Sequence, residues 1–297
     1  MAVATGGDIG FGVLPEDCIA NALSLTSPED ACRLSLVASA FYSAAQFDAV
    51  WERFLPADYR DIISRSGDAA DLLASASKKD LYFRLCDNPI LIDDGTKSFS
   101  LEKKSGKKCY MLAARSLKIV WSDTPRYWQW ISLPESRFSE AAELLDVCWL
   151  EICGKINSSM LSPNTNYAAY LVFSLQPRAY GFEYQPVEAS IEINGHEGQK
   201  KTVYLDHQRP QKEGFTIIPR RIGIFNQRVI HRMRQRENAG YSKERSDKWM
   251  EVELGEFFVK NGQDAEIAMC LMQIKSHWKS GVIVQGIEIR PKGRINE

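Results

Sequence analysis

The 297-residue sequence predicts an α+β protein with more than one domain, in which a helical N-terminal part precedes a β-sandwich or barrel. Helix-start signals recur in the first 86 residues. From about residue 97 onward, apolar residues alternate with a period of two, and Pro, Gly, Asn and Asp separate the runs. The composition, 44% hydrophobic and 25% charged, is that of an ordinary globular protein.

Two helix starts can be read directly from the N-terminal residues. Pro15 is followed by two acidic residues, which suit the first turn of a helix because they face the positive end of its dipole. Ser27 fits an N-cap, Pro28 a first helical residue and Asp30 the acidic position of a capping box. The spacing predicts three short helices in about 40 residues, and a unit this small usually needs a partner to bury enough surface.

The next segment, residues 60–86, is also predicted to be helical, because "LYFRLC" places Leu81, Tyr82 and Leu85 on one side. Pro89 and Gly95 then interrupt the pattern and indicate a domain boundary. Beyond it lie the runs that predict strands: "LKIVW", "AAYLVFSL", "VEASIEIN", "WMEVELGEFFV", "AEIAMCLMQI" and "VIVQGIEIR".

Charge and targeting signals exclude several classes of protein. A formal net charge of -1 argues against a general nucleic acid binder. The N-terminus resembles no signal peptide, and no apolar run is long enough to cross a membrane. The seven cysteines are scattered and form no CxxC pair, so we expect a reduced intracellular chain with neither a disulfide framework nor a zinc site.

Motifs for catalysis are absent from the sequence. The four histidines have no metal-ligand spacing, and no GxSxG, GxGxxG or GxxxxGK[ST] run occurs. We therefore expect no catalytic residues, no metal site and no cofactor.

Two stretches resemble known families. Leu14-Pro15-Glu16, the Pro28-Glu29-Asp30 helix start, "RLSLVASAFYSAA" and Trp51 are similar to an F-box, which places that domain at residues 10–55. "KKCYMLAARSLKIVWSDTPRYWQW" and "KWMEVELGEFF" resemble the plant phloem-lectin domain (phloem protein 2, related to the tobacco jasmonate-inducible lectin), expected at 95–297. Residues 56–94 are then a helical linker.

This resemblance implies that the two domains have different roles. An F-box docks on the Skp-type adaptor of a Skp–cullin–F-box ubiquitin ligase, and the second domain, an antiparallel, jelly-roll-like β-sandwich, selects the target. Targets in this family often carry N-acetylglucosamine glycans, and such a receptor subunit needs no catalytic residue. The expected location is the cytoplasm, the nucleus or both. The adaptor-binding residues implied are Leu14, Pro15, Ile19, Leu34, Val37 and Phe41.

The same resemblance assigns carbohydrate contacts to Trp121 and Trp128, with Asp123 as a hydrogen-bonding neighbour. A flat indole suits the apolar face of a pyranose. Strand alternation offers another interpretation, because Trp121 would point inward with Leu117 and Ile119. Trp128 shares a strand face with Trp130, so we expect at least one of these two rings in the core. The alternation of inward-pointing and outward-pointing side chains can end at the turn predicted for residues 122–125.

Two further alternatives concern the role of the whole chain. The second domain could recognise a protein surface without reading a glycan, or it could act as a lectin outside any ligase. The arginine-rich segment 220–248 could bind RNA or phosphate, or direct nuclear import. Because its basic residues are spread out and lack interleaved aromatic residues, we favour a solvated loop or short helix.

Overall fold

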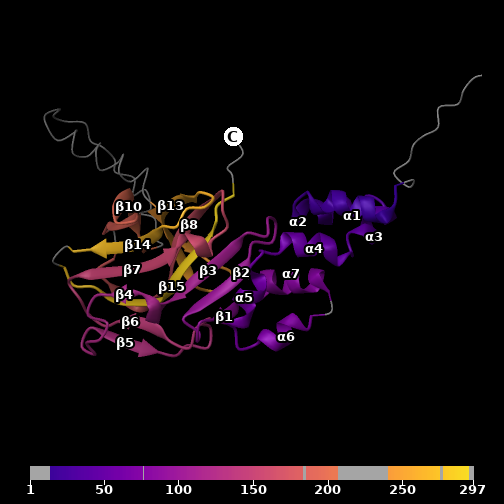
Figure 1. Cartoon of the computed structure of the whole chain (residues 1–297). Helices are drawn as coiled ribbons and strands as arrows, with labels where there is room; N and C mark the ends of the chain where they lie inside the picture. The colour runs from indigo at the N-terminus through magenta and orange to yellow at the C-terminus, as the bar shows by residue number, and fades with distance from the viewer. Residues whose placement is uncertain (1–13, 76, 183–184, 207–239, 275–276, 294–297) are drawn as a thin grey trace, which may run out of the picture. The chain divides into compact units, whose positions relative to one another are not determined.

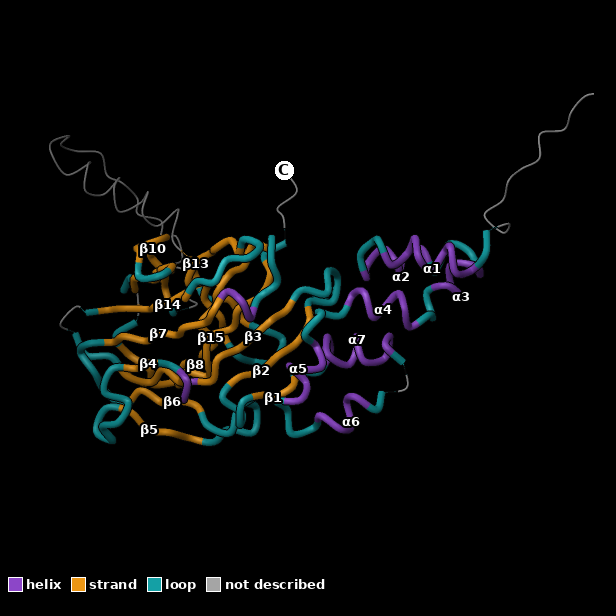
Figure 2. Tube along the Cα trace, viewed as in Figure 1, coloured by secondary structure: helices purple, strands orange, loops and turns teal. Residues whose placement is uncertain are grey.

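The computed structural model describes residues 14–75, 77–182, 185–206, 240–274 and 277–293 (Figure 1). The chain divides into two compact units. The first comprises residues up to 94 together with 99–109, and the second comprises 95–98 and residues from 110 onward. Helices make up most of the first unit and strands most of the second (Figure 2).

The helices of the first unit are short. They are α1 (Glu16–Ser24), α2 (Pro28–Leu34), α3 (Ser39–Ala44), α4 (Asp48–Phe54), α5 (Tyr59–Ser64), α6 (Ala69–Leu73) and α7 (Lys78–Asp87). Within the described part of the F-box there are thus four helices, and the predicted three-helix count is wrong. The backbone turns at Phe47, which has an extended conformation, so the predicted third helix is divided into α3 and α4.

The two predicted helix starts lie within one residue of the observed ones. Pro15 caps α1 from outside, and its carbonyl accepts hydrogen bonds from the N–H groups of Cys18 and Ile19. Ser27 caps α2, where its Oγ accepts from the N–H of Asp30 at 3.1 Å. Local capping chemistry therefore accounts for both starts.

Trp51 organises the core of the first unit. Its side chain is fully buried, and its Nε1 donates to the carbonyl of Ala45 at 2.8 Å. Its ring centroid lies 5.6 Å from that of Phe54 and 5.2 Å from that of Tyr82 on α7. Residues 56–94 accordingly share a core with the F-box helices instead of forming an extended spacer.

Each of the six predicted runs overlaps a strand, and further strands lie between them. The strands are β1 (Ile90–Ile92), β2 (Lys97–Leu101), β3 (Lys108–Ala113), β4 (Lys118–Ile119), β5 (Trp128–Ile131), β6 (Ala141–Leu144), β7 (Leu150–Asn157), β8 (Thr165–Tyr180), β9 (Val187–Ile193), β10 (His196–Tyr204), β11 (Gly240–Tyr241), β12 (Lys243–Glu244), β13 (Met250–Val259), β14 (Glu266–Gln273) and β15 (Ser280–Pro291).

The second unit contains two large sheets. In the first, β3, β15, β8, β13 and β12 are neighbours in that order, and the β5–β6 hairpin joins through β6 to β15. In the second, the order is β11, β10, β9, β14, β7 and β4. The pairings among these strands are antiparallel except for the parallel pair β10–β11. The predicted class, helices followed by antiparallel sheets, is therefore confirmed.

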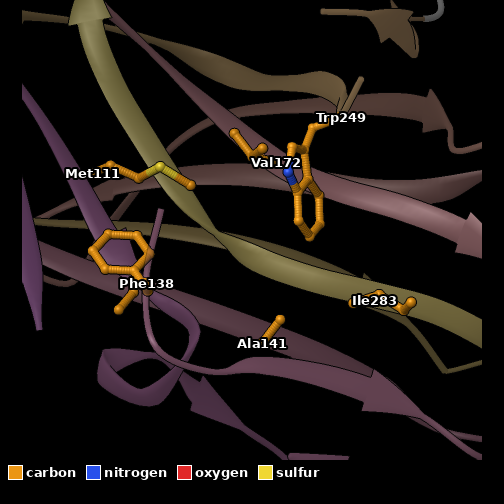
Figure 3. Close-up of a cluster of buried hydrophobic side chains, with 7 residues drawn as sticks. Met111, Phe138, Ala141, Val172, Trp249 and Ile283 are labelled. Atoms are coloured by element: carbon orange, nitrogen blue, oxygen red, sulfur yellow. The ribbon is translucent and has the colours of Figure 1, made fainter. Parts of the chain in front are cut away.

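Side chains of the two sheets meet at Gly154 of β7. A Cβ at this position would lie 3.0 Å from Ile287 of β15 and 3.1 Å from Leu112 of β3, so glycine permits the close approach. A second apolar cluster includes Met111, Phe138, Val172 and Trp249 (Figure 3). The Trp249 indole donates to the carbonyl of Glu135 at 3.0 Å, which ties the loop between β5 and β6 to the residue that precedes β13.

One expectation about the cysteines is wrong. Cys153 of β7 and Cys270 of β14 form a disulfide, with their Cα atoms 4.2 Å apart. The two residues face each other in register on neighbouring antiparallel strands. Because they are 117 residues apart in the sequence, spacing motifs could not reveal the pair. The remaining five cysteines form no disulfide.

We expect this disulfide to stabilise the second unit. Replacing both partners, Cys153→Ser with Cys270→Ser, should cost about 2–4 kcal/mol of unfolding free energy, because the closed loop is long. Thermal unfolding with and without dithiothreitol measures the effect, and the double variant should be insensitive to the reductant. Cys18→Ser, which changes an exposed free cysteine, should keep the sensitivity of the wild type. Reaction of all seven cysteines with a thiol reagent in unreduced, unfolded protein would contradict the bond.

Candidate functional site

The first unit exposes several large apolar side chains near its N-terminal helices. Leu36 and Val37 lie in the turn between α2 and α3, and Val37 is 71% exposed. Leu14, just before α1, and Tyr42 on α3 are also more than half exposed. We call Leu14, Leu36, Val37 and Tyr42 the apolar F-box surface. Exposed apolar side chains on a single small unit indicate contact with another protein.

The predicted adaptor residues divide into three groups. Leu14, Pro15 and Val37 are exposed, and Leu34 and Phe41 are half-buried. Ile19 is only 2% exposed, so it holds α1 in the core and cannot itself contact a partner in this conformation. Sequence reasoning missed Leu36 and Tyr42, because it followed the helical spacing and Leu36 lies in a turn.

In the second unit, the segment between β4 and β5 forms a compact turn that carries Trp121. The N–H of Ser122 donates to the carbonyl of Ile119 at 3.2 Å, and that of Thr124 donates to the carbonyl of Trp121 at 3.0 Å. Trp121 has φ = 61°, a left-handed conformation that bulky residues seldom adopt. This backbone reversal ends the strand alternation, and the Trp121 side chain is 40% exposed instead of pointing inward with Ile119.

Trp128 does not share this exposure. Its side chain is 2% exposed, and its Nε1 donates to the carbonyl of Val120 at 3.1 Å. The buried ring of Trp128 therefore offers no face on which a sugar could stack. Its predicted role as a carbohydrate contact does not agree with this burial. Trp130 Nε1 donates to the carbonyl of Ser122 at 3.3 Å. The two indoles of β5 thus hold the turn that presents Trp121.

The groups around Trp121 are suited to a polar ligand with an apolar face. Its ring lies 5.4 Å from that of Tyr127, with the ring planes inclined by 39°. Asp123 is exposed in the same turn, as the sequence prediction required of a hydrogen-bonding residue. We call Trp121, Asp123 and Tyr127 the tryptophan-turn site. Its residues offer two aromatic rings and one carboxylate in the segment between β4 and β5.

Charges elsewhere in the second unit are largely paired. Arg245, one of the basic residues in the 220–248 segment, donates to Glu288 at 2.6 Å and to Glu251 at 2.8 Å. Burial opposes ionisation of Glu288, but the hydrogen bond from Arg245 and nearby arginine charges outweigh it and keep the pKa of Glu288 below its usual value. Arg245 is therefore a structural ion-pair partner. Residues 220–239 of the basic segment lie outside the described residues.

Neither a metal site nor a membrane segment is found in the described residues. No group of three or more His, Cys, Asp or Glu side chains is placed to hold a metal ion in these ranges. No helix in the same part of the chain is long and apolar enough to span a membrane.

Comparison with known protein families accounts for both units. The phloem protein 2 family matches residues 107–291, and the F-box domain matches residues 12–53. The chain belongs to the phloem protein 2 family. An F-box domain together with a phloem protein 2 domain defines its organisation. The F-box implies a Skp-type adaptor and a cullin as partners, and F-box proteins are in general non-catalytic substrate adaptors of such ligases.

Related proteins with both domains occur in Arabidopsis thaliana. The F-box protein PP2-B1 is 42% identical over 308 residues, covering 95% of this chain and 90% of the relative. The F-box protein PP2-B10 is 44% identical over 284 residues, covering 95% of this chain and 94% of the relative. These plant relatives are similar along nearly their entire lengths, so the two-domain organisation is common to them and to this chain.

Similarity to solved structures is weak. A β-(1,4)-mannanase of Podospora anserina matches with a TM-score of 0.31 and 8% identity over 62% of this chain and 28% of that chain. A xylan-binding domain from Paenibacillus barcinonensis matches with a TM-score of 0.26 and 10% identity over 61% of this chain and 85% of that chain. At these TM-scores, neither match supports a conclusion about the fold or the function of this chain.

The different burial of the two tryptophans gives a direct stability prediction. Trp128→Ala should lower the unfolding free energy by about 3–5 kcal/mol, because it leaves a large cavity and removes a hydrogen bond to the turn. Trp121→Ala should change the stability by less than about 1 kcal/mol, because the ring is substantially exposed. Thermal unfolding of the full chain measures both. Equal losses of stability would contradict the observed burial of the two rings.

Proposed function

We propose that this chain is the substrate-recognition subunit of a Skp–cullin–F-box ubiquitin ligase whose second unit binds glycans on its targets. The observation that supports it most is the separation of two exposed surfaces: the apolar F-box surface on one unit and the tryptophan-turn site on the other. One surface suits a protein adaptor, and the other suits a ligand that combines an apolar face with hydroxyl groups.

Adaptor binding is supported by the chemistry of the apolar F-box surface. The exposed side chains of this surface, Leu14, Leu36, Val37 and Tyr42, are apolar. Burying them against a partner would stabilise the complex by about 25 cal/mol for each Å² of apolar surface removed from water. The receptor then needs no catalytic groups of its own, because it brings the target to the ligase. We place this activity in the cytoplasm, the nucleus or both, where a cullin ligase would meet its targets.

Glycan binding is supported by the presentation of Trp121. The reversed backbone turns its ring outward, and the buried indole of Trp128 holds that turn through Val120. A preorganised ring stacks on a pyranose with little loss of conformational entropy, while Asp123 can accept hydrogen bonds from sugar hydroxyls. N-acetylglucosamine is the sugar that we propose. The contact is shallow, so single-site dissociation constants should lie at roughly micromolar to millimolar values.

The finer architecture belongs to the same proposal. We take the two sheets as a β-sandwich with jelly-roll-like connections, since Ile287 of β15 and Leu112 of β3 lie directly against Gly154 of β7 in the other sheet. A sandwich leaves its connecting turns free to vary and to bind ligands. The tryptophan-turn site is such a connection, between β4 and β5.

Two alternative functions would give different results in binding experiments. Glycan-independent recognition of a target protein would keep adaptor binding and show no glycan binding. A lectin acting outside the ligase would bind glycans without binding the adaptor.

The first test addresses the adaptor. The double variant Leu14→Ala/Pro15→Ala should abolish co-purification with a co-expressed Skp-type adaptor, because both residues are exposed beside α1. The second unit should keep its unfolding temperature. Leu73→Ala is the matched control, since Leu73 is 44% exposed on α6 in the same unit but lies outside the apolar F-box surface. Undiminished co-purification of the double variant would refute the docking site.

The second test addresses the glycan. Trp121→Ala should remove binding of the full chain to N-acetylglucosamine-containing glycans on an array, while its unfolding temperature hardly changes. Phe258→Ala is the control, because Phe258 is a 50% exposed aromatic residue on β13, a strand that pairs with neither β4 nor β5. If Trp121→Ala binds the same glycans as the wild type, the sugar contact lies elsewhere. If the wild type binds none, recognition is glycan-independent.

A further inference from the structure

The disulfide between Cys153 and Cys270 lies on the outer face of its sheet. The residues directly before and after Cys153 on β7 are buried, and so are those around Cys270 on β14, whereas both cysteines are half-buried. Side chains alternate along a strand, so both cysteines point away from the core. Trp149, just before β7, is 44% exposed and donates through its Nε1 to Glu151 of the same face at 3.2 Å. Solvent therefore reaches this face of β7, and a small thiol compound can approach the bond.

Polar residues flank the bond on the neighbouring strands. Lys118 of β4 lies opposite Cys153, and Ser190 of β9 lies opposite Cys270. Residues directly opposite each other share a face of the sheet, so both lie on the outer face with the disulfide. The Lys118 side chain is 78% exposed, and its ammonium group favours a negative charge on the nearest cysteine. Cys153 is therefore the better leaving group when a thiolate attacks the bond.

The other five cysteines of the chain form no disulfide. Cys18 is exposed, and the remaining four are partly exposed. Unbonded thiols are typical of a compartment in which thiols are kept reduced, in agreement with the cytoplasmic or nuclear location proposed above. A disulfide in such a compartment is usually transient and serves catalysis or redox sensing, and exposed disulfides are the ones most readily reduced. We therefore expect the Cys153–Cys270 bond to respond to the redox state of its surroundings.

The disulfide also lies beside the short strand that leads into the tryptophan-turn site. β4 has only two residues, is at the edge of its sheet and pairs with β7. After it, the N–H of Val120 donates to the carbonyl of Glu151 at 3.1 Å, and Trp121 follows directly. The disulfide ties β7 to β14 just beyond Glu151. Freedom that β7 gains when the bond opens is therefore passed to β4 and to the backbone before Trp121.

We propose that the Cys153–Cys270 bond is a reversible redox site, which a dithiol reduces in the folded protein, and that its reduction loosens β4. One thiolate of the dithiol attacks Sγ of Cys270, a new S–S bond forms, and the Cys153–Cys270 bond breaks with Cys153 leaving as a thiolate. The second thiol of the dithiol loses its proton, attacks the dithiol's own sulfur in this mixed disulfide and releases Cys270. The two cysteines take up the two protons, two electrons have passed to the protein, and the dithiol has become a disulfide. A small disulfide such as glutathione disulfide reverses the change.

The first measurement follows reduction of the folded full chain by dithiothreitol, with alkylation of the thiols by iodoacetamide and intact mass as the readout. Well below the unfolding temperature, the reductant should add two alkylated cysteines to the wild type, at a rate proportional to its concentration. The double variant Cys153→Ser/Cys270→Ser should gain none. Reduction at a rate independent of the dithiothreitol concentration, or only within the unfolding transition, would overturn the proposal, because the bond would then open only after the protein unfolds.

The second measurement compares amide hydrogen exchange in the oxidised and reduced full chain. The Val120 amide should exchange about tenfold faster after reduction, and glutathione disulfide should restore the slow rate. The Arg245 amide is the internal control, because it donates to the carbonyl of Trp249 at 2.8 Å in the turn between β12 and β13, and its rate should change less than about twofold. Equal Val120 exchange in the two redox states would overturn the proposal, because the bond would then not act on β4. Neither measurement depends on adaptor or glycan binding, so the proposed function is tested separately.

Discussion

The second unit depends on the central position of β15. This strand pairs with β3, β6 and β8, so three separate parts of the chain are joined to it. Gly286 permits this crowding, because a Cβ there would lie only 2.0 Å from the carbonyl oxygen of Leu112. On the same strand Glu288 accepts hydrogen bonds from Arg245 and Arg290. Glu288 is mostly buried, and these two arginine side chains compensate its negative charge.

The exposed surfaces depend on buried groups that lie directly behind them. Trp128 and Trp130 hold the carbonyl groups of Val120 and Ser122, and the turn between these residues displays Trp121. Lys279 does the same for Trp149 by binding the carbonyl of Cys148. Burial lowers the pKa of Lys279, and the carbonyl groups compensate for part of the lost hydration of its ammonium group. In both cases a buried hydrogen-bond donor determines the orientation of an exposed ring.

Local signals in the sequence predicted the parts of the fold that depend on local chemistry. Ser27 and Pro28 marked the start of α2 because capping involves residues only three apart. The alternation in "WMEVELGEFFV" similarly predicted β13. The disulfide between Cys153 and Cys270 could not be predicted in this way, because it depends on the register of β7 against β14.

The tryptophan motif shows how one backbone angle changes the assignment of a site. The alternation rule placed Trp121 inward with Ile119, and the positive φ at Trp121 reverses that direction. Trp128 is the first residue of β5, and its side chain points into the core. A motif with two tryptophans can therefore expose one ring at the surface and bury the other in the core. The exposure of Trp121 depends on the backbone of the turn, and the indoles of Trp128 and Trp130 hold that turn in place.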